Sequence, residues 1–163
     1  MFGFGIKKRT REAISRGVQA SLTGAYFHPS QIEKYNLNKD ASAWILTETY
    51  AHHLYAIGCI ATHACQNDKW ATFDFFVNSA LEGIRKSEKK GGPNTDELAP
   101  IMFKRYSEME AHSSEARLND EHYRESALLV SKQDKSANID VLTRAFKGST
   151  EKYMEDVRKM FGV

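Results

Sequence analysis

Cysteine is scarce in this sequence and strand patterns are missing, and both absences narrow the class of protein. Its 163 residues include two cysteines, Cys59 and Cys65. Six residues of helix would separate their Cα atoms by roughly 9 Å, beyond the ~7 Å limit for a disulfide. We therefore expect free thiols and a reducing compartment, the cytoplasm. No alternating apolar and polar run is bounded by hairpin turns, and no repeat of solenoid period is present.

The sequence also lacks an apolar run long enough to cross a membrane. Its longest apolar stretch is interrupted by Glu48, His52, His53 and His63. The opening FGFGI run is short and precedes its basic residues, which is the reverse of the order in a signal peptide. We therefore expect a soluble cytoplasmic protein.

Motifs of catalysis and of nucleotide binding are missing as well. There is no Gly-x-Ser-x-Gly elbow, and Gly91-Gly92 lacks the preceding strand that phosphate-binding loops need. No histidine follows a glutamate by three residues, so the Glu-x-x-His pattern of di-iron bundles is absent. We do not expect an enzyme, and the sequence identifies no cofactor.

An excess of one charge is lacking over the whole chain, although the charges are unevenly distributed. A net charge of +2 argues against a dedicated nucleic-acid binder, which needs a concentrated basic face. Basic residues gather near the start of the chain and at 85–90, whereas acidic residues outnumber basic ones at 108–125. Opposite patches on one molecule are typical of solvated faces or of self-association.

The most informative feature that is present is the stretch 40–66, which predicts one long helix. Apolar side chains, among them Trp44, Leu54 and Ile57, point in almost every direction around its axis. A helix that is apolar on all sides must be buried on all sides. We therefore expect it to be the central, fully buried rod of an all-α bundle of five to six helices, with Asp40 as its N-terminal cap.

Apolar residues at helical spacing predict the elements around this rod. Helices are expected over about 7–27, 67–90 and 138–161, with a short helical turn over 31–35. The stretch 95–130 forms one long helix or two shorter ones.

The whole chain, residues 1–163, is expected to form a single α-helical domain. At this length a domain buries roughly 70% of the surface that its unfolded chain exposes. Gly91-Gly92-Pro93 begins the main break between helices, at 91–95, and residues 1–6 are a candidate flexible leader.

A polar strip on the central helix is the first candidate for a site. Glu48 and His52 are four residues apart and share a face, where a carboxylate and an imidazole can hydrogen-bond or share a metal ion. Cys59 and His63 form a second such pair. His63 lies roughly 16 Å from His52 along the axis, so one ion cannot reach both histidines through this helix. Either pair would need ligands from other helices.

Two interpretations of these histidines compete. His52 or His63 could bind a haem or another cofactor, and Glu48 with His52 could contribute to a metal site. Alternatively, they are core residues that hydrogen-bond to neighbouring helices, which is the commoner state of a buried polar group. We favour the structural interpretation.

The N-terminal segment combines an apolar tip with a basic collar. Phe2 and Phe4 precede Lys7, Lys8 and Arg9, and this combination could contact an anionic membrane surface or a partner subunit. Stable anchoring takes more apolar area or a lipid. We therefore favour phenylalanines that pack on the bundle or on a partner.

The missing catalytic motifs favour a binding or assembly module that acts through protein–protein contact or self-association. The last helix supports this hypothesis, because Ile139, Leu142, Phe146 and Tyr153 belong to a near-heptad stripe suited to helix pairing. The alternative is a bundle that binds a small ligand, haem or metal through polar residues of the central helix. A third hypothesis is peripheral attachment to a membrane through the N-terminus.

Overall fold

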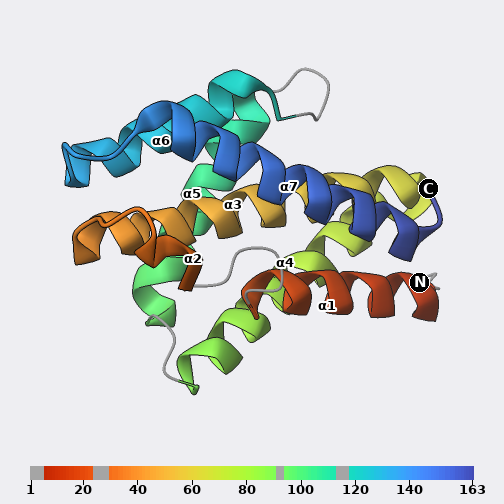
Figure 1. Cartoon of the computed structure of the whole chain (residues 1–163). Coiled ribbons are helices and arrows are strands. Elements are labelled where there is room, and N and C mark those ends of the chain that lie inside the picture. Colours follow the sequence, from red (N-terminus) through yellow and green to blue (C-terminus); the bar gives the residue numbers. More distant parts are fainter. Residues whose placement is uncertain (1–5, 24–29, 91–93, 113–117) are drawn as a thin grey trace.

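The computed structural model describes residues 6–23, 30–90, 94–112 and 118–163, and within these ranges the chain contains helices but no strand. The expected all-α bundle is confirmed. Its elements are α1 (Lys8–Leu22), α2 (Ser30–Glu33), α3 (Lys39–Ala64), the 3₁₀ turn η1 (Gln66–Asp68), α4 (Lys69–Glu88), α5 (Thr95–His112), α6 (Asp120–Gln133) and α7 (Ile139–Phe161) (Figure 1).

Helix α3 is the central rod that its sequence predicts. It packs against α1, α4, α5, α6 and α7 (Figure 1). Every residue from Thr47 to Gly58 is buried. Burial is less complete near its two ends, where Ala43 and His63 are exposed. A helix without a polar face is stable in water only when neighbouring helices cover all of its sides.

The apolar stripe of α7 faces into the bundle. Leu142, Phe146, Tyr153 and Val157 are at most 1% exposed. They belong to the packing of α7 against α3, α6 and α1. The helix pairing that this stripe predicts therefore takes place within the chain, and the stripe is not free to pair with a second molecule.

The start of α3 and the end of α1 differ from the sequence-based expectation. Asn38, not Asp40, caps α3: its side chain accepts a 2.9 Å hydrogen bond from the Ala41 amide. The Asn38 amide donates to Asp134 at 2.8 Å, so this cap also ties α3 to the loop after α6. Helix α1 ends at Leu22, earlier than the predicted end at Phe27, which lies outside the described residues.

The stretch 95–130 contains two helices. Asn119 begins the second one with a reciprocal cap, in which its side chain accepts from the His122 amide and its own amide donates to His122 Nδ1. This pairing satisfies two amides at the start of α6. Because an independent cap defines α6, the two-helix alternative is confirmed.

Candidate functional site

A buried polar cluster joins α3, α5 and α6, and it includes the predicted pair Glu48 and His52. Glu48, His52 and Ser126 have no exposed surface, and Arg105 is 8% exposed. Arg105 Nε donates to Glu48 Oε2 at 2.9 Å, and Arg105 Nη2 donates to Ser126 Oγ at 3.2 Å. The two residues of α3 are therefore held by side chains from two other helices.

The hydrogen bonds of this cluster determine how its protons are arranged. Ser126 has one hydroxyl proton, and it donates that proton to the Glu48 carboxylate, which can only accept. The contact of 3.1 Å between Ser126 Oγ and His52 Nε2 must then use a proton on Nε2. His52 is therefore the Nε2–H tautomer, and its Nδ1 carries a lone pair.

Two acceptor atoms of the cluster have no hydrogen-bond partner among the described residues. They are Glu48 Oε1 and His52 Nδ1. The His52 ring lies between Tyr123 and Phe146, with ring-centroid distances of 5.1 and 5.5 Å in edge-on geometry. A buried acceptor without a donor is unfavourable, so these two atoms suit a water molecule or a small hydrogen-bond donor.

Charge within the cluster is balanced by Arg105. Burial alone would lower the pKa of Arg105, but the carboxylates of Glu48, Glu108 and Glu125 outweigh burial and raise it. Burial, followed by the charge of Arg105, holds the pKa of His52 well below its ordinary value. The cluster thus contains one buried ion pair and a neutral imidazole.

The same guanidinium bears on the prediction of a metal at Glu48 and His52. Arg105 already supplies positive charge to Glu48, and a second cation beside it would be repelled. In the part of the chain that the structure describes, no group of three or more His, Cys, Asp or Glu residues is placed to hold a metal ion. The pair alone offers two ligands, fewer than a closed site requires.

His53 is a second buried histidine, and sequence reasoning missed its role. Its Nδ1 lies 3.0 Å from Ser21 Oγ of α1, and its Nε2 lies 3.0 Å from Ser149 Oγ of α7. Its ring stacks on Tyr153 at a centroid distance of 4.3 Å. Burial lowers the pKa of His53 to about 3, and a hydrogen bond with the Ser149 backbone offsets only part of that effect. His53 therefore connects three helices in its neutral form.

The second predicted pair does not form part of the buried cluster. His63 is exposed at the end of α3, whereas Cys59 is half-buried. Burial raises the pKa of Cys59 to about 11, so its thiol stays protonated at neutral pH. Cys59 and Cys65 are both free thiols, as expected.

The N-terminal candidates are divided between described and undescribed residues. Lys7, Lys8 and Arg9 are exposed at the start of α1. Ile6 is 8% exposed, so this residue of the predicted leader is packed on the bundle. Phe2 and Phe4 lie outside the described residues. None of the helices that the structure describes is both long and apolar enough to span a membrane.

The fold and the buried cluster define a helical bundle with a polar centre. Comparison of the chain with protein-family models, with curated proteins and with solved structures gives no match.

Proposed function

We propose that this protein is a non-enzymatic assembly module that associates with a second copy of itself through an apolar strip on α4. The strip consists of Trp70, Phe73 and Val77, which recur at helical spacing. One observation carries the proposal: Trp70 is 76% exposed. Phe73 and Val77 beside it are half-buried.

The physical basis is the size and position of the indole ring. A tryptophan side chain is among the largest apolar surfaces that a protein can bury, and tryptophan is enriched among residues that dominate binding energy. The ring centroid of Phe73 lies about 6 Å from those of Phe76 and Tyr106, so this part of the strip packs on the core.

The charges beside the strip favour a second copy as the partner. Lys69 and Asp74 are both exposed and lie on either side of Trp70 along α4. In a two-fold symmetric contact each patch meets the same patch of the other molecule, so a patch with both charges can pair with itself. The inward-facing cluster of Glu48, His52, Arg105 and Ser126 joins three helices, which supports a structural role for it.

Analytical ultracentrifugation over a range of protein concentrations tests this proposal. We expect reversible dimerisation of the wild-type protein. Trp70→Ala should raise the dissociation constant by about 30-fold or more, because removing a hot-spot side chain costs about 2 kcal/mol. Leu128→Ala is the matched control, since Leu128 is an exposed leucine on α6, away from the strip. A wild-type protein that stays monomeric at high concentration contradicts the proposal.

A small-ligand function is the second candidate, and the unpartnered Glu48 Oε1 and His52 Nδ1 favour it. A ligand that donates two hydrogen bonds would satisfy both atoms. Native mass spectrometry of gently purified protein tests this candidate. The candidate requires an additional mass that His52→Ala removes while the helical content is retained.

A further inference from the structure

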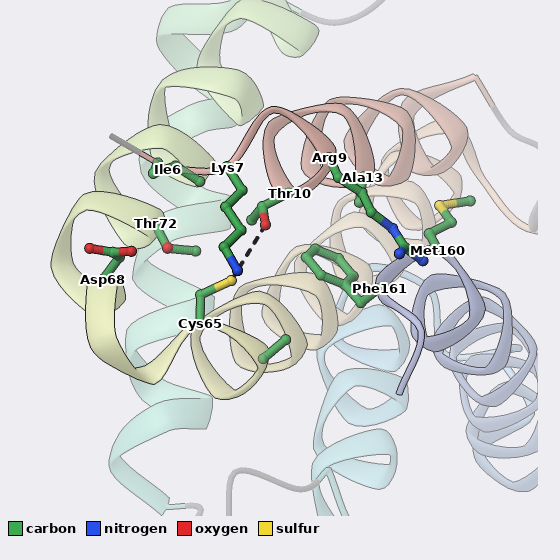
Figure 2. Close-up of a pocket in the computed structure, with 11 residues that line it drawn as sticks. Ile6, Lys7, Arg9, Thr10, Ala13, Cys65, Asp68, Thr72, Met160 and Phe161 are labelled. Carbon is green, nitrogen blue, oxygen red and sulfur yellow. Dashed lines mark hydrogen bonds between the residues drawn. The ribbon is translucent and has the colours of Figure 1, made fainter. Parts of the chain in front are cut away.

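A pocket of about 260 Å³ lies at the end of the bundle where the first and last helices meet (Figure 2). It is lined by the start of α1, the end of α3, the beginning of α4 and the end of α7. Ile6, Met160 and Phe161 give it an apolar wall. Its polar lining comes from Lys7, Arg9, Thr10, Cys65, Asp68 and Thr72.

Two cationic side chains, Lys7 and Arg9, line this pocket. Helix α1 begins beside it with Lys7 as a cap that makes no side-chain hydrogen bond, and no acidic residue occupies the first turn. Helix α4 also begins beside it without a side-chain cap and without an acidic residue in its first turn. Helix N-termini carry partial positive charge and usually attract acidic groups, whereas the ends of α3 and α7 at the same pocket carry partial negative charge. Lys7 and Arg9 add full positive charges, and Asp68 opposes only one of them.

The Arg9 side chain lies close to the end of α7. A Cβ atom on Gly162 would lie 3.2 Å from Arg9 Nη2, so the guanidinium lies close to the C-terminal turn of α7. The carbonyl groups at a helix C-terminus attract cations. Arg9 is exposed and lines the pocket beside the end of α7.

Thr72 contributes to the pocket lining a hydroxyl group that has no hydrogen-bond partner among the described residues. Its side chain is fully buried. On the opposite wall Thr10 Oγ1 lies 3.6 Å from Cys65 Sγ, a weak contact that a better acceptor could replace (Figure 2).

We propose that this pocket binds a small soluble organic anion, with its carboxylate or phosphate group at Lys7 and Arg9. Thr10 donates a hydrogen bond to the same group, and the apolar part of the ligand packs on Ile6, Met160 and Phe161. A cavity of 150 Å³ accommodates benzene, so this pocket accommodates a ligand of about ten non-hydrogen atoms. Arginine is well suited to the anionic group because its planar fork matches two oxygen atoms.

Protection of Cys65 from a thiol reagent tests the proposal. The experiment uses a Cys59→Ala variant, so that Cys65 is the one remaining thiol. Phenyl phosphate and phenylacetate are the probes, phenol is the neutral control, and chloride keeps the ionic strength constant. We expect both anions to slow the modification of Cys65 in a saturable manner, and phenol to have no such effect. Absence of saturable protection overturns the proposal.

Substitutions show whether the protection arises at the pocket. Arg9→Gln should weaken binding by about tenfold, the effect of losing one charge-assisted hydrogen bond. Arg16→Gln removes the same charge from an exposed position of the same helix and should change binding by less than about twofold. An equal loss of affinity in both variants would mean that the overall positive charge of the helix attracts the anion, without a specific site. That result would overturn the proposal.

The source of the anionic group is distinguished by a vesicle experiment. Vesicles that contain phosphatidic acid present a phosphate group on a membrane surface. Protection of Cys65 by these vesicles, but not by phenyl phosphate or phenylacetate, would overturn the assignment to a small soluble anion. Protection by the free anions with no further effect of vesicles is the expected result.

Discussion

Glu48 is a charged side chain without access to solvent, and its ion pair with Arg105 offsets the cost of burying that charge. Separating the pair leaves a carboxylate in the core with one hydroxyl as its remaining partner. We expect Arg105→Met to destabilise the protein by about 3–5 kcal/mol, the usual cost of breaking a buried ion pair from one side. Urea denaturation followed by circular dichroism measures this change. The double variant Glu48→Gln, Arg105→Met should recover part of the loss, and a loss below about 1 kcal/mol in Arg105→Met would mean that water reaches Glu48.

The buried histidines predict that the protein loses stability in mild acid. The pKa of His53 is about 3 in the folded protein, below the value of 6.5 expected when the chain is unfolded. The unfolded state therefore binds more protons below pH 6.5, and stability present above that pH is lost as the pH falls toward 3. For His53 alone the loss between pH 7.5 and 5 is about 2 kcal/mol. His52 contributes in the same direction.

Urea denaturation at several pH values between 7.5 and 5 measures this dependence. The range lies above the ordinary pKa of carboxyl groups, so histidines dominate the change. His53→Gln should reduce the slope by about half, because His52 remains. A free energy of unfolding that does not change between pH 7.5 and 5 would contradict neutral, buried histidines.

The sequence predicts only the part of the polar cluster that lies on one helix, Glu48 and His52. Glu48 and His52 share a helical face because they are four residues apart, and that relation is visible in the sequence. Arg105 and Ser126 are 57 and 78 residues away from Glu48, so their contacts depend on how α5 and α6 pack. The sequence offered one sign of these contacts: Arg105 lies in α5, a helix with a thin apolar stripe. His53 was missed because its partners come from α1 and α7.

At the scale of elements, Gly17 determines how closely α1 approaches α3. A Cβ atom at Gly17 would lie 2.3 Å from Ile57 Cδ1 and 3.4 Å from the Tyr153 hydroxyl. That hydroxyl donates a 2.8 Å hydrogen bond to the Gly17 carbonyl. Ile57 and Tyr153 are fully buried, so a side chain at Gly17 would force Ile57 to shift within the packed core. The lack of a side chain at Gly17 thus allows three helices to meet.

Gly17→Ala and Gly148→Ala form a matched pair of substitutions. We expect Gly17→Ala to destabilise the protein by about 1–3 kcal/mol through overpacking. A Cβ atom at Gly148, in the exposed face of α7, would meet nothing within 4 Å. Gly148→Ala should therefore stabilise by about 0.5–1 kcal/mol, the gain in helix propensity. Thermal and urea denaturation measure both, and stabilisation by Gly17→Ala would contradict the close contact.

Most helices are predictable from the spacing of apolar residues. The residues at which they end, and the helices against which they pack, are harder to predict. The buried rod, α3, has the strongest signal because it is apolar in nearly all directions. The stripe of α7 was detected, but its spacing does not reveal whether the partner lies in the same chain. The cap of α3 was misplaced because Asn38 and Asp40 are both good capping residues, and contacts with Asp134 favour Asn38.

At the scale of the whole molecule, we propose self-association through Trp70, Phe73 and Val77. The helix stripe that first suggested pairing is buried within the bundle, so the self-association that we propose uses another surface. Trp70 provides one, because its ring is mostly exposed while its neighbours on α4 anchor the strip to the core. Covering this ring with a second copy would remove a large apolar area from water.

The fluorescence of Trp70 measures that covering directly. The protein has two tryptophans, so a Trp44→Phe variant leaves Trp70 as the one emitter. At low protein concentration its emission should match that of an indole in water. As the concentration rises, the emission should shift to the blue along the same curve as the sedimentation-derived dimer fraction. An emission spectrum that stays water-like while the protein dimerises, or at every concentration reached, would contradict association through this strip.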